Sequence, residues 1–155
     1  MPSTADLITW GQLFQEMDIS MATLGRDLGG SLPDNAHVGQ KKIGRLLGTR
    51  QSPTDANVLE LWFDGGQNTD VPPAAWSPLS GDTVIQYYRD ATSAAFIRKN
   101  TKTTKQFIAA KCLSDMTITA PDAGHLQIRL TFSSLVKATG KTLSRTCTLI
   151  AKKNP

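Results

Sequence analysis

The chain has 155 residues, of which 39% are hydrophobic and 19% charged. This is the length of one domain, and it can bury a core without disulfides or metals. It has no run of about 18 consecutive apolar residues, so no membrane-spanning helix is expected. The N-terminal MPSTADLITWGQ has no basic region followed by an apolar run, so it is not a signal peptide, and we expect a protein that is made in a cytosol and stays soluble there.

The net charge of +4 is unevenly distributed along the chain. Residues 1–78 hold five Lys/Arg and nine Asp/Glu, a net charge of −4, whereas residues 79–155 hold twelve and four, a net charge of +8. Such asymmetry suits either a nucleic-acid surface or contacts between acidic and basic faces of identical subunits. Because no basic block is longer than Lys152-Lys153, the second interpretation is favoured.

Residue types that carry catalysis are sparse in this chain. His37 and His125 have no His or Cys at metal-ligand spacing, and Cys112 and Cys147 are predicted to be reduced core thiols. The glycine-rich phosphate and dinucleotide loops and the Gly-x-Ser-x-Gly motif are absent from the sequence. The sequence therefore predicts no catalytic residue, no metal and no cofactor.

The N-terminal third is predicted to hold one or two short helices. Helical spacing of apolar residues predicts a helix from Ala5 to about Met17, with a strand over LITWGQLF as the alternative. The following LGRDLGGSLPDNAHVGQ predicts a loop. KKIGRLL predicts a helical turn whose basic side chains either contact phosphate or form a solvated face; these are Lys41, Lys42 and Arg45.

Strands are predicted from residue 58 onward. Apolar, β-branched and aromatic runs predict strands over residues 58–63, 83–89, 95–99 and 142–151. Residues 67–81 contain three prolines and predict a long irregular segment. In an assembling protein such a segment would be an arm that reaches a neighbour.

The clearest periodicity lies in the second arm of a predicted hairpin over residues 105–136. Leu126, Ile128, Leu130 and Phe132 alternate with polar residues, as on a strand with one buried face. The first arm changes phase, which predicts either a bulge or a strand covered on both faces. APDAG, residues 120–124, supplies the turn between the arms.

Together these elements predict a mainly β protein, an antiparallel β-sandwich or barrel with one or two short helices. The whole chain, residues 1–155, is read as a single domain with an irregular arm around residues 67–81. An alternative function is a nucleic-acid-binding β-barrel module that uses four cations near Tyr87, Tyr88, Phe96 and Phe107. These cations are Arg98, Lys99, Lys102 and Lys105.

KQFIAAKCLSDMTITAPDAGHLQIRLTFSSLVKATG resembles the C-terminal region of bacteriophage tail tube (major tail) proteins. The matching pattern is a strand of the form F-x-small-x-V/C-x-S, an A-P-x-x-G loop and an alternating strand that ends in F-x-S/G. The match covers about a quarter of the chain. The resemblance implies a non-enzymatic virion protein, assembled in the host cytoplasm, that forms hexameric rings by extending sheets between subunits.

The resemblance also implies roles for individual residues. The rings would stack into a tail tube through which DNA passes, in contact with other phage tail proteins. Three polar residues would face the lumen: Gln127, Arg129 and Thr131. Eight residues would pack the core or the subunit interface: Phe107, Cys112, Met116, Ile118, Leu126, Ile128, Leu130 and Phe132. A tail terminator or a baseplate hub protein is an alternative within the same class.

Overall fold

The computed structural model describes residues 3–29, 31–38, 41–67 and 72–154, with only the backbone described for 31–38 and 41–43. The described chain is 49% strand and contains one helix and nine strands. Their bounds are α1 Thr4–Leu28, β1 Ser31–Val38, β2 Lys41–Gln51, β3 Leu59–Phe63, β4 Thr83–Arg89, β5 Phe96–Asn100, β6 Gln106–Ala110, β7 Leu113–Asp122, β8 His125–Val136 and β9 Lys141–Lys152. The mainly β prediction is confirmed.

The strands form two antiparallel sheets rather than a closed barrel in the described chain. β1 to β6 form a six-stranded sheet in sequence order, and β7, β8 and β9 form a three-stranded sheet. The C-terminal end of β9 is joined to the larger sheet, because the backbone of Asn154 exchanges hydrogen bonds with Thr49 of β2. The predicted exposed tail is therefore tied to β2 at this residue.

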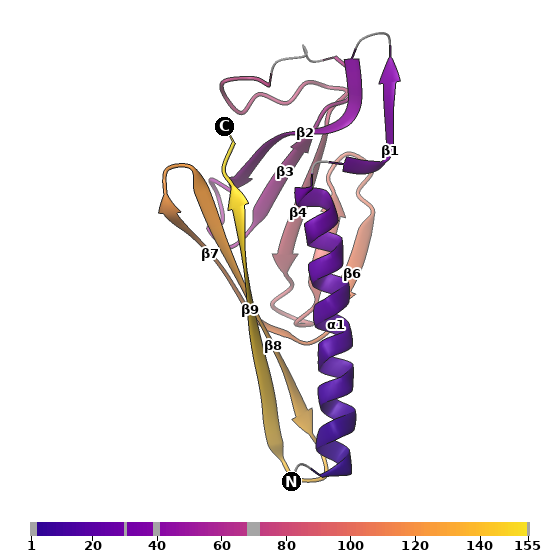
Figure 1. Ribbon diagram of the computed structural model, residues 1–155, viewed down its shortest axis with the longest axis vertical. Coiled ribbons are helices and arrows are strands. Elements are labelled where there is room, and N and C mark those ends of the chain that lie inside the picture. The colour runs from indigo at the N-terminus through magenta and orange to yellow at the C-terminus, as the bar shows by residue number, and fades with distance from the viewer. Residues whose placement is uncertain (1–2, 30, 39–40, 68–71, 155) are drawn as a thin grey trace.

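α1 runs along the two long strands β8 and β9 and continues to the six-stranded sheet (Figure 1). Ser3 and Asp6 form a capping box at its start, which supplies hydrogen-bond partners for backbone groups of the first turn. The predicted helix end near Met17 was wrong. The apolar spacing continues through Leu24 to Leu28, and Gly29 follows as the cap.

Two further predictions in the N-terminal third were wrong. The residues predicted as loop include the last turns of α1 and all of β1, and KKIGRLL begins β2 rather than forming a helical turn. β2 is extended because it pairs with both β1 and β3, and such tertiary pairing overrides a weak local helical pattern. The side chains of Lys41 and Lys42 lie outside the described residues, and the Arg45 guanidinium lies 3.7 Å from the Asp64 carboxylate.

The first arm of the predicted hairpin consists of two strands rather than one. β6 belongs to the six-stranded sheet, and the chain crosses to the other sheet at Lys111 and Cys112 before β7 begins. The change of phase in the sequence arises from this crossing and from a register shift between Leu113 and Asp115. The turn to β8 is also shorter than predicted, because β7 continues to Asp122.

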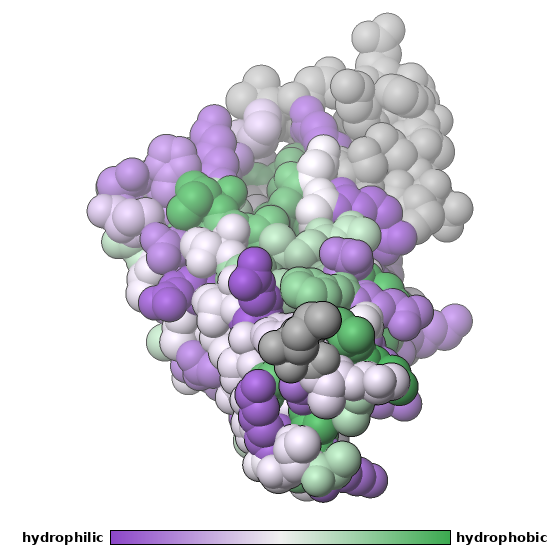
Figure 2. All heavy atoms as spheres, turned by 60° about the horizontal axis from the view of Figure 1, so that its bottom comes forward, coloured by the Kyte–Doolittle hydropathy of each residue, from purple (hydrophilic) through white to green (hydrophobic). Residues whose placement is uncertain are grey.

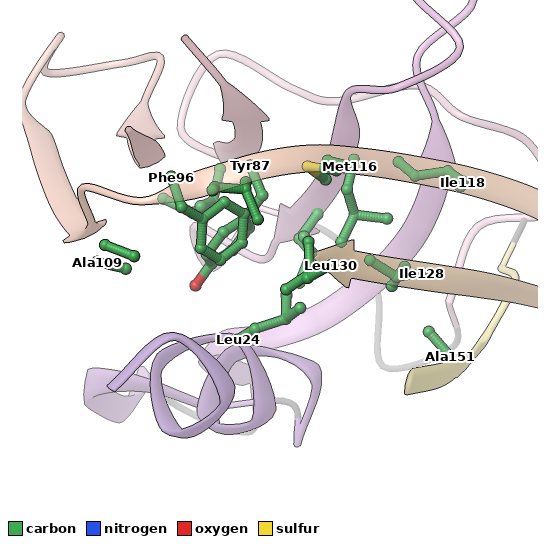
Figure 3. Close-up of a cluster of buried hydrophobic side chains, with 14 of the residues drawn as sticks. Leu24, Tyr87, Phe96, Ala109, Met116, Ile118, Ile128, Leu130 and Ala151 are labelled. Carbon is green, nitrogen blue, oxygen red and sulfur yellow. The ribbon is translucent and has the colours of Figure 1, made fainter. Parts of the chain in front are cut away.

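The core lies between α1 and the two sheets. Leu24 of the helix, Tyr87 and Phe96 of the larger sheet, and Ile128 and Leu130 of β8 all point into it (Figure 3). Ala109 of β6 and Ala151 of β9 leave room for close approach at its margins. One continuous core thus joins the helix to both sheets, as a single domain requires.

The irregular segment, whose described parts are Gln67 and residues 72–81, packs on its own sheet. The Trp76 ring lies 5.5 Å from the Trp62 ring and 4.0 Å from the Arg50 guanidinium, measured from ring centroids. The Asp82 carboxylate accepts hydrogen bonds from Trp62 Nε1 and from the backbone N–H of Leu79. The predicted lack of helix and strand is confirmed in the described part, where Trp76 contacts β3 while most of the other residues of the segment are exposed.

Candidate functional site

The three-stranded sheet has two chemically different faces. Its inner face, toward the core and α1, carries apolar residues that are buried. They are Met116 and Ile118 of β7 and Leu126, Ile128, Leu130 and Phe132 of β8. These six residues were among those predicted for the core or a subunit interface, and the structure brings them together on one face.

The outer face of this sheet carries an array of hydroxyl groups. By the pairing register it includes Thr117, Thr119, Thr131, Ser133, Thr142, Ser144, Thr146 and Thr148. Hydroxyls of facing residues bond across the strands, Thr131 with Thr146 at 2.9 Å and Ser133 with Ser144 at 2.7 Å. Gln127 and Arg129, predicted with Thr131 to face a lumen, lie on this same face.

The two edges of the sheet differ in how they are covered. Along β7, Arg89 Nε donates to the carbonyl of Leu113 at 2.6 Å, and Gln51 Nε2 donates to that of Ile118 at 3.0 Å. β9 pairs with β8 over its whole length, and no described strand pairs with its other edge. The open edge of β9 is therefore the longest stretch of backbone in the described chain that is available to a further strand.

The β8–β9 hairpin projects beyond the rest of the sheet. β7 begins opposite Phe132, and the Ser133 N–H still donates to the carbonyl of Cys112 just before it. Beyond this point the hairpin lies beside the N-terminal half of α1 (Figure 1). On this end Figure 2 shows hydrophobic residues at the surface among polar ones. Leu7, Ile8 and Leu135 are 58%, 59% and 56% exposed. Such exposed apolar side chains are available for contact with another molecule.

Two predicted interface residues of the first arm lie away from the buried inner face. Phe107 is 49% exposed on the edge strand β6, so it is not a core residue of the monomer. Cys112 is half-buried at the crossing between the sheets, where its thiol donates to the Glu16 carboxylate. Burial, together with the hydrogen bond to Glu16 and the charge of that carboxylate, raises the pKa of Cys112 to about 12.

The second predicted thiol, Cys147, is half-buried and its sulfur lies 3.4 Å from that of Met21 in α1. Burial raises its pKa. Both cysteines are free, as predicted. The two thiols stay protonated near neutral pH, which is unfavourable for a nucleophile or a metal ligand.

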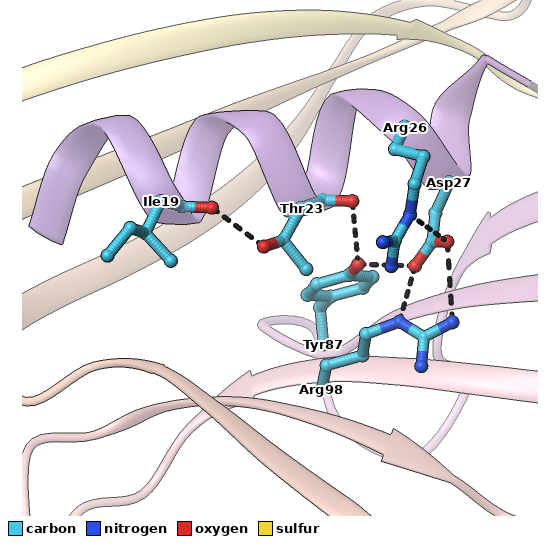
Figure 4. A network of polar contacts seen from close by, with 6 residues as sticks. All are labelled: Ile19, Thr23, Arg26, Asp27, Tyr87 and Arg98. Carbon is cyan, nitrogen blue, oxygen red and sulfur yellow. Dashed lines mark hydrogen bonds and ion pairs between the residues drawn. The ribbon is translucent and has the colours of Figure 1, made fainter. Parts of the chain in front are cut away.

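The cations predicted for nucleic-acid contact are dispersed. Arg98 points inward and binds the buried Asp27 carboxylate, with its Nε 2.6 Å from Asp27 Oδ2 (Figure 4). Lys102 Nζ donates to the carbonyl of Gly81, and Lys105 is exposed on the turn between β5 and β6. Lys99 pairs with Gln106 and Gln86, on the sheet face opposite Arg98. Arg98 and Lys105 line one pocket with Phe107, but Lys99 faces the other side of the sheet, so the four residues do not form one basic surface.

Asp27 is the centre of a buried polar network that the sequence did not predict. Its carboxylate accepts hydrogen bonds from the Tyr87 hydroxyl and from Arg98 (Figure 4). Burial, then the Asp27 charge and hydrogen bond, raises the pKa of Tyr87 above its ordinary value. Arg98 balances the charge of Asp27, so this network fixes the C-terminal end of α1 to the larger sheet.

At the turn between β7 and β8, Asp122 accepts hydrogen bonds from His125 Nδ1 at 2.9 Å and from the Gly124 N–H at 2.7 Å. These bonds lower the pKa of Asp122, the His125 bond most. The Asp122 side chain therefore closes the turn that the APDAG sequence predicted. Among the described residues, no group of three or more His, Cys, Asp or Glu is placed to hold a metal ion.

Sequence reasoning missed most of the hydroxyl array, because only three residues of β8 were assigned to the outer face. The Thr-x-Ser-x-Thr-x-Thr run of β9, from Thr142 to Thr148, has the same period of two and was the available signal. Asp27 was missed because its partners lie 60 and 71 residues away. Trp76 carried no local signal of its contact with Trp62.

Comparisons with protein-family models, with curated proteins and with solved structures found no match. In the part of the chain that the structure describes, no helix is long and apolar enough to cross a membrane. The arguments about function therefore rest on the geometry of the described residues.

Proposed function

We propose that this protein is a structural subunit of a virion tail, and that copies of it assemble into stacked rings, hexameric as in the proteins that its sequence resembles, which form a tube for DNA passage. The observation that carries the proposal is the three-stranded sheet, which combines a hydroxyl-covered outer face with an open edge strand. The edge of β9 offers backbone groups along 12 residues. Such an edge is a template for pairing with another chain, and closure into a ring uses it without further growth.

The chemistry of the outer face supports a role as a lumen wall. By register its charged side chains on β7, β8 and β9 include Arg129, Lys152 and Asp115. The basic residues Lys141 and Arg145 lie on the other face, paired with Val136 and Phe132. Phosphate binding strengthens with the number of cations that contact it, so a hydroxyl surface with few cations lets DNA pass without holding it.

Electron microscopy tests the proposal directly. Purified protein is examined by negative stain over a concentration series, with light scattering on the same samples. We expect rings or tubes with a central hole and a mass that rises with concentration. A protein that stays monomeric at its highest soluble concentration, alone and with other tail components, would contradict the proposal.

A pair of proline variants tests whether the β9 edge makes the contact. The N–H groups of adjacent strand residues point to opposite sides, so one of Thr146 and Cys147 faces β8 and the other faces outward. Proline removes the N–H at its position, so one of Thr146→Pro and Cys147→Pro breaks a hydrogen bond to β8 and the other removes only an outward N–H. We expect the variant that lacks the outward N–H to unfold at the higher temperature of the two and to fail to assemble. Assembly of that variant at wild-type level would show that the β9 edge is not used.

A further inference from the structure

The tip of the β8–β9 hairpin is cationic. Lys137 and Lys141 flank its turn, and residues 133–144 contain no Asp or Glu. The Lys141 ammonium lies 3.8 Å from the Asp6 carboxylate of α1, whereas Lys137 is exposed and takes part in none of the described ion pairs. Leu135, beside Lys137, is largely exposed on the outer face. The tip therefore presents a cation and an apolar side chain that have no partner in the described chain.

A groove elsewhere on the same molecule has the opposite charge. It is lined by the β2–β3 loop, the end of β4 and the start of β7, with a volume of about 250 Å³, and its lining includes Asp55, Val58, Tyr88, Arg89 and Asp115. Asp115 is exposed and takes part in none of the described ion pairs. The Asp55 carboxylate accepts from the N–H of Asn57, and its backbone carbonyl accepts from the N–H of Val58.

The groove lining has the chemistry that a lysine side chain would need. It combines Tyr88 and Val58, whose apolar surface suits a lysine stem, with the Asp55 and Asp115 carboxylates, which suit an ammonium group. Arg89 is the cation among the lining residues, and its Nε is held by the carbonyl of Leu113. The carboxylates outnumber it, so the groove favours a cationic guest.

We propose that the hairpin tip of one copy docks in this groove of a second copy, with Lys137 facing Asp115 and Asp55 and Leu135 packing at the rim. The inference rests on the proposed function, because it names the contact through which copies join. Tip and groove are different surfaces of one molecule, so each copy offers one of each. Such head-to-tail contacts propagate along an assembly, which suits the stacking of one ring on the next.

Charge reversal at one position on each surface tests the contact. Lys137→Glu places a carboxylate opposite an acidic groove, and Asp115→Lys places an ammonium opposite a cationic tip. Sedimentation velocity at low salt measures assembly of each variant. We expect each to assemble about tenfold or more weakly than the wild type, because like charges then face each other at low ionic strength.

Mixing the two variants gives the decisive result. The acidic tip of the Lys137→Glu variant then meets the basic groove of the Asp115→Lys variant, and the unchanged tip of the second variant meets the unchanged groove of the first. We expect the mixture, and the double variant Lys137→Glu/Asp115→Lys, to assemble at close to wild-type strength. A loss caused by damage to the fold would not be rescued by mixing two separately folded proteins.

Lys105→Glu is the matched control, since it reverses an exposed cation on the β5–β6 turn, away from tip and groove. It should assemble like the wild type. If Lys137→Glu also assembles like the wild type, or if the mixture stays as weak as its components, the tip-and-groove contact is wrong while ring assembly stands. If the wild type itself never assembles, the proposed function fails and this contact fails with it.

Discussion

The two ends of α1 are held to the rest of the molecule in different ways. At the C-terminal end, Leu24 and Asp27 are fully buried, and Asp27 binds both Tyr87 and Arg98 of the larger sheet. At the N-terminal end, a capping box orders the first turn while Leu7 and Ile8 remain largely exposed. The C-terminal end of α1 is therefore part of the core, whereas its N-terminal end packs against the projecting β8–β9 hairpin.

This difference separates the residues that stabilise the fold from those available for contacts. The side chains at the buried C-terminal end of α1 contact residues of several strands that are distant in sequence. Removing these side chains should therefore destabilise the monomer. The projecting end is covered on one side only, and its exposed apolar residues contribute little to folding. Substitutions matched between the two ends can test this division.

The largest effect is expected for Asp27→Ala. It leaves the half-buried Arg98 without its carboxylate partner, while the Tyr87 hydroxyl keeps only the carbonyl of Thr23 as an acceptor. Loss of one partner from a buried ion pair costs about 3–5 kcal/mol. Urea unfolding measures this free energy. Asp18→Ala, an exposed site on the same helix, should change it by less than about 0.5 kcal/mol. Equal effects at the two sites would show that the network does not fix the helix.

A comparison of leucines comes next. Leu24→Ala removes a fully buried side chain and is expected to lower the free energy of unfolding by about 2–5 kcal/mol. Leu7→Ala, at an exposed position near the other end, is expected to change it by less than about 0.5 kcal/mol. Thermal or urea unfolding distinguishes the two. A large loss at Leu7 would mean that the projection is part of the cooperative core.

Alkaline pH provides a third test of the buried C-terminal end of α1. The folded state raises the pKa of Tyr87 above its ordinary value of 10, so the folded protein holds this proton more tightly than the unfolded chain. The stabilisation is fully present below pH 10 and is lost as pH rises above it, by up to about 1.4 kcal/mol per pH unit. Urea unfolding between pH 9 and 11 measures the slope. Tyr87→Phe should reduce the slope, and the part that remains is expected from Cys112 and Cys147, whose pKa values are also raised. An unchanged slope would rule out Tyr87 as a source.

A smaller effect, though above that of the exposed control sites, is expected for the helix cap at the projecting end. Ser3→Ala removes the side-chain acceptor for the Asp6 N–H and is expected to cost about 1 kcal/mol. Thermal unfolding by circular dichroism checks the value, with Thr4→Ala as a neighbouring control outside the capping box. A Ser3 effect as large as that of Asp27→Ala would contradict the division between the two ends.

The sequence predicted the strands best where one face is buried and the other is exposed. β8 alternates strictly because its inner face packs in the core and its outer face is open, so the period of two is visible without any other information. β3 is buried along its whole length, with Glu60 of its outer face bonded to Arg50 and Gln86 and Trp62 in contact with Trp76. It was predicted from apolar composition and flanking turn residues instead.

The errors have a common physical cause, which is pairing between distant segments. β1 contains Pro33, Asp34 and Asn35, residues typical of loops, yet it pairs with β2 through an irregular register. α1 continues past Met17 because Leu24 and Asp27 find partners in β4 and β5. Local propensity carried no information about these partners, so the predicted helix ended about eleven residues before its observed end at Leu28.

The candidate site was predicted in part. The outer-face positions Gln127, Arg129 and Thr131 were identified from alternation in β8 alone. The contributions of β7 and β9 require the register, which no single strand reveals. The exposed position of Phe107 was also missed, since its neighbourhood depends on the chain crossing between sheets directly after β6.

The long β8–β9 ladder has a mechanical consequence. Its twelve residue pairs lie beside α1, and both run close to the long axis of the molecule (Figure 1). The hydrogen bonds of an antiparallel ladder lie perpendicular to the strands. A pull along that axis on opposite strands therefore loads all of these bonds in shear at once, whereas a pull that separates the strands at the tip would break them one after another. The molecule should accordingly resist tension along its length far better than peeling at its tip.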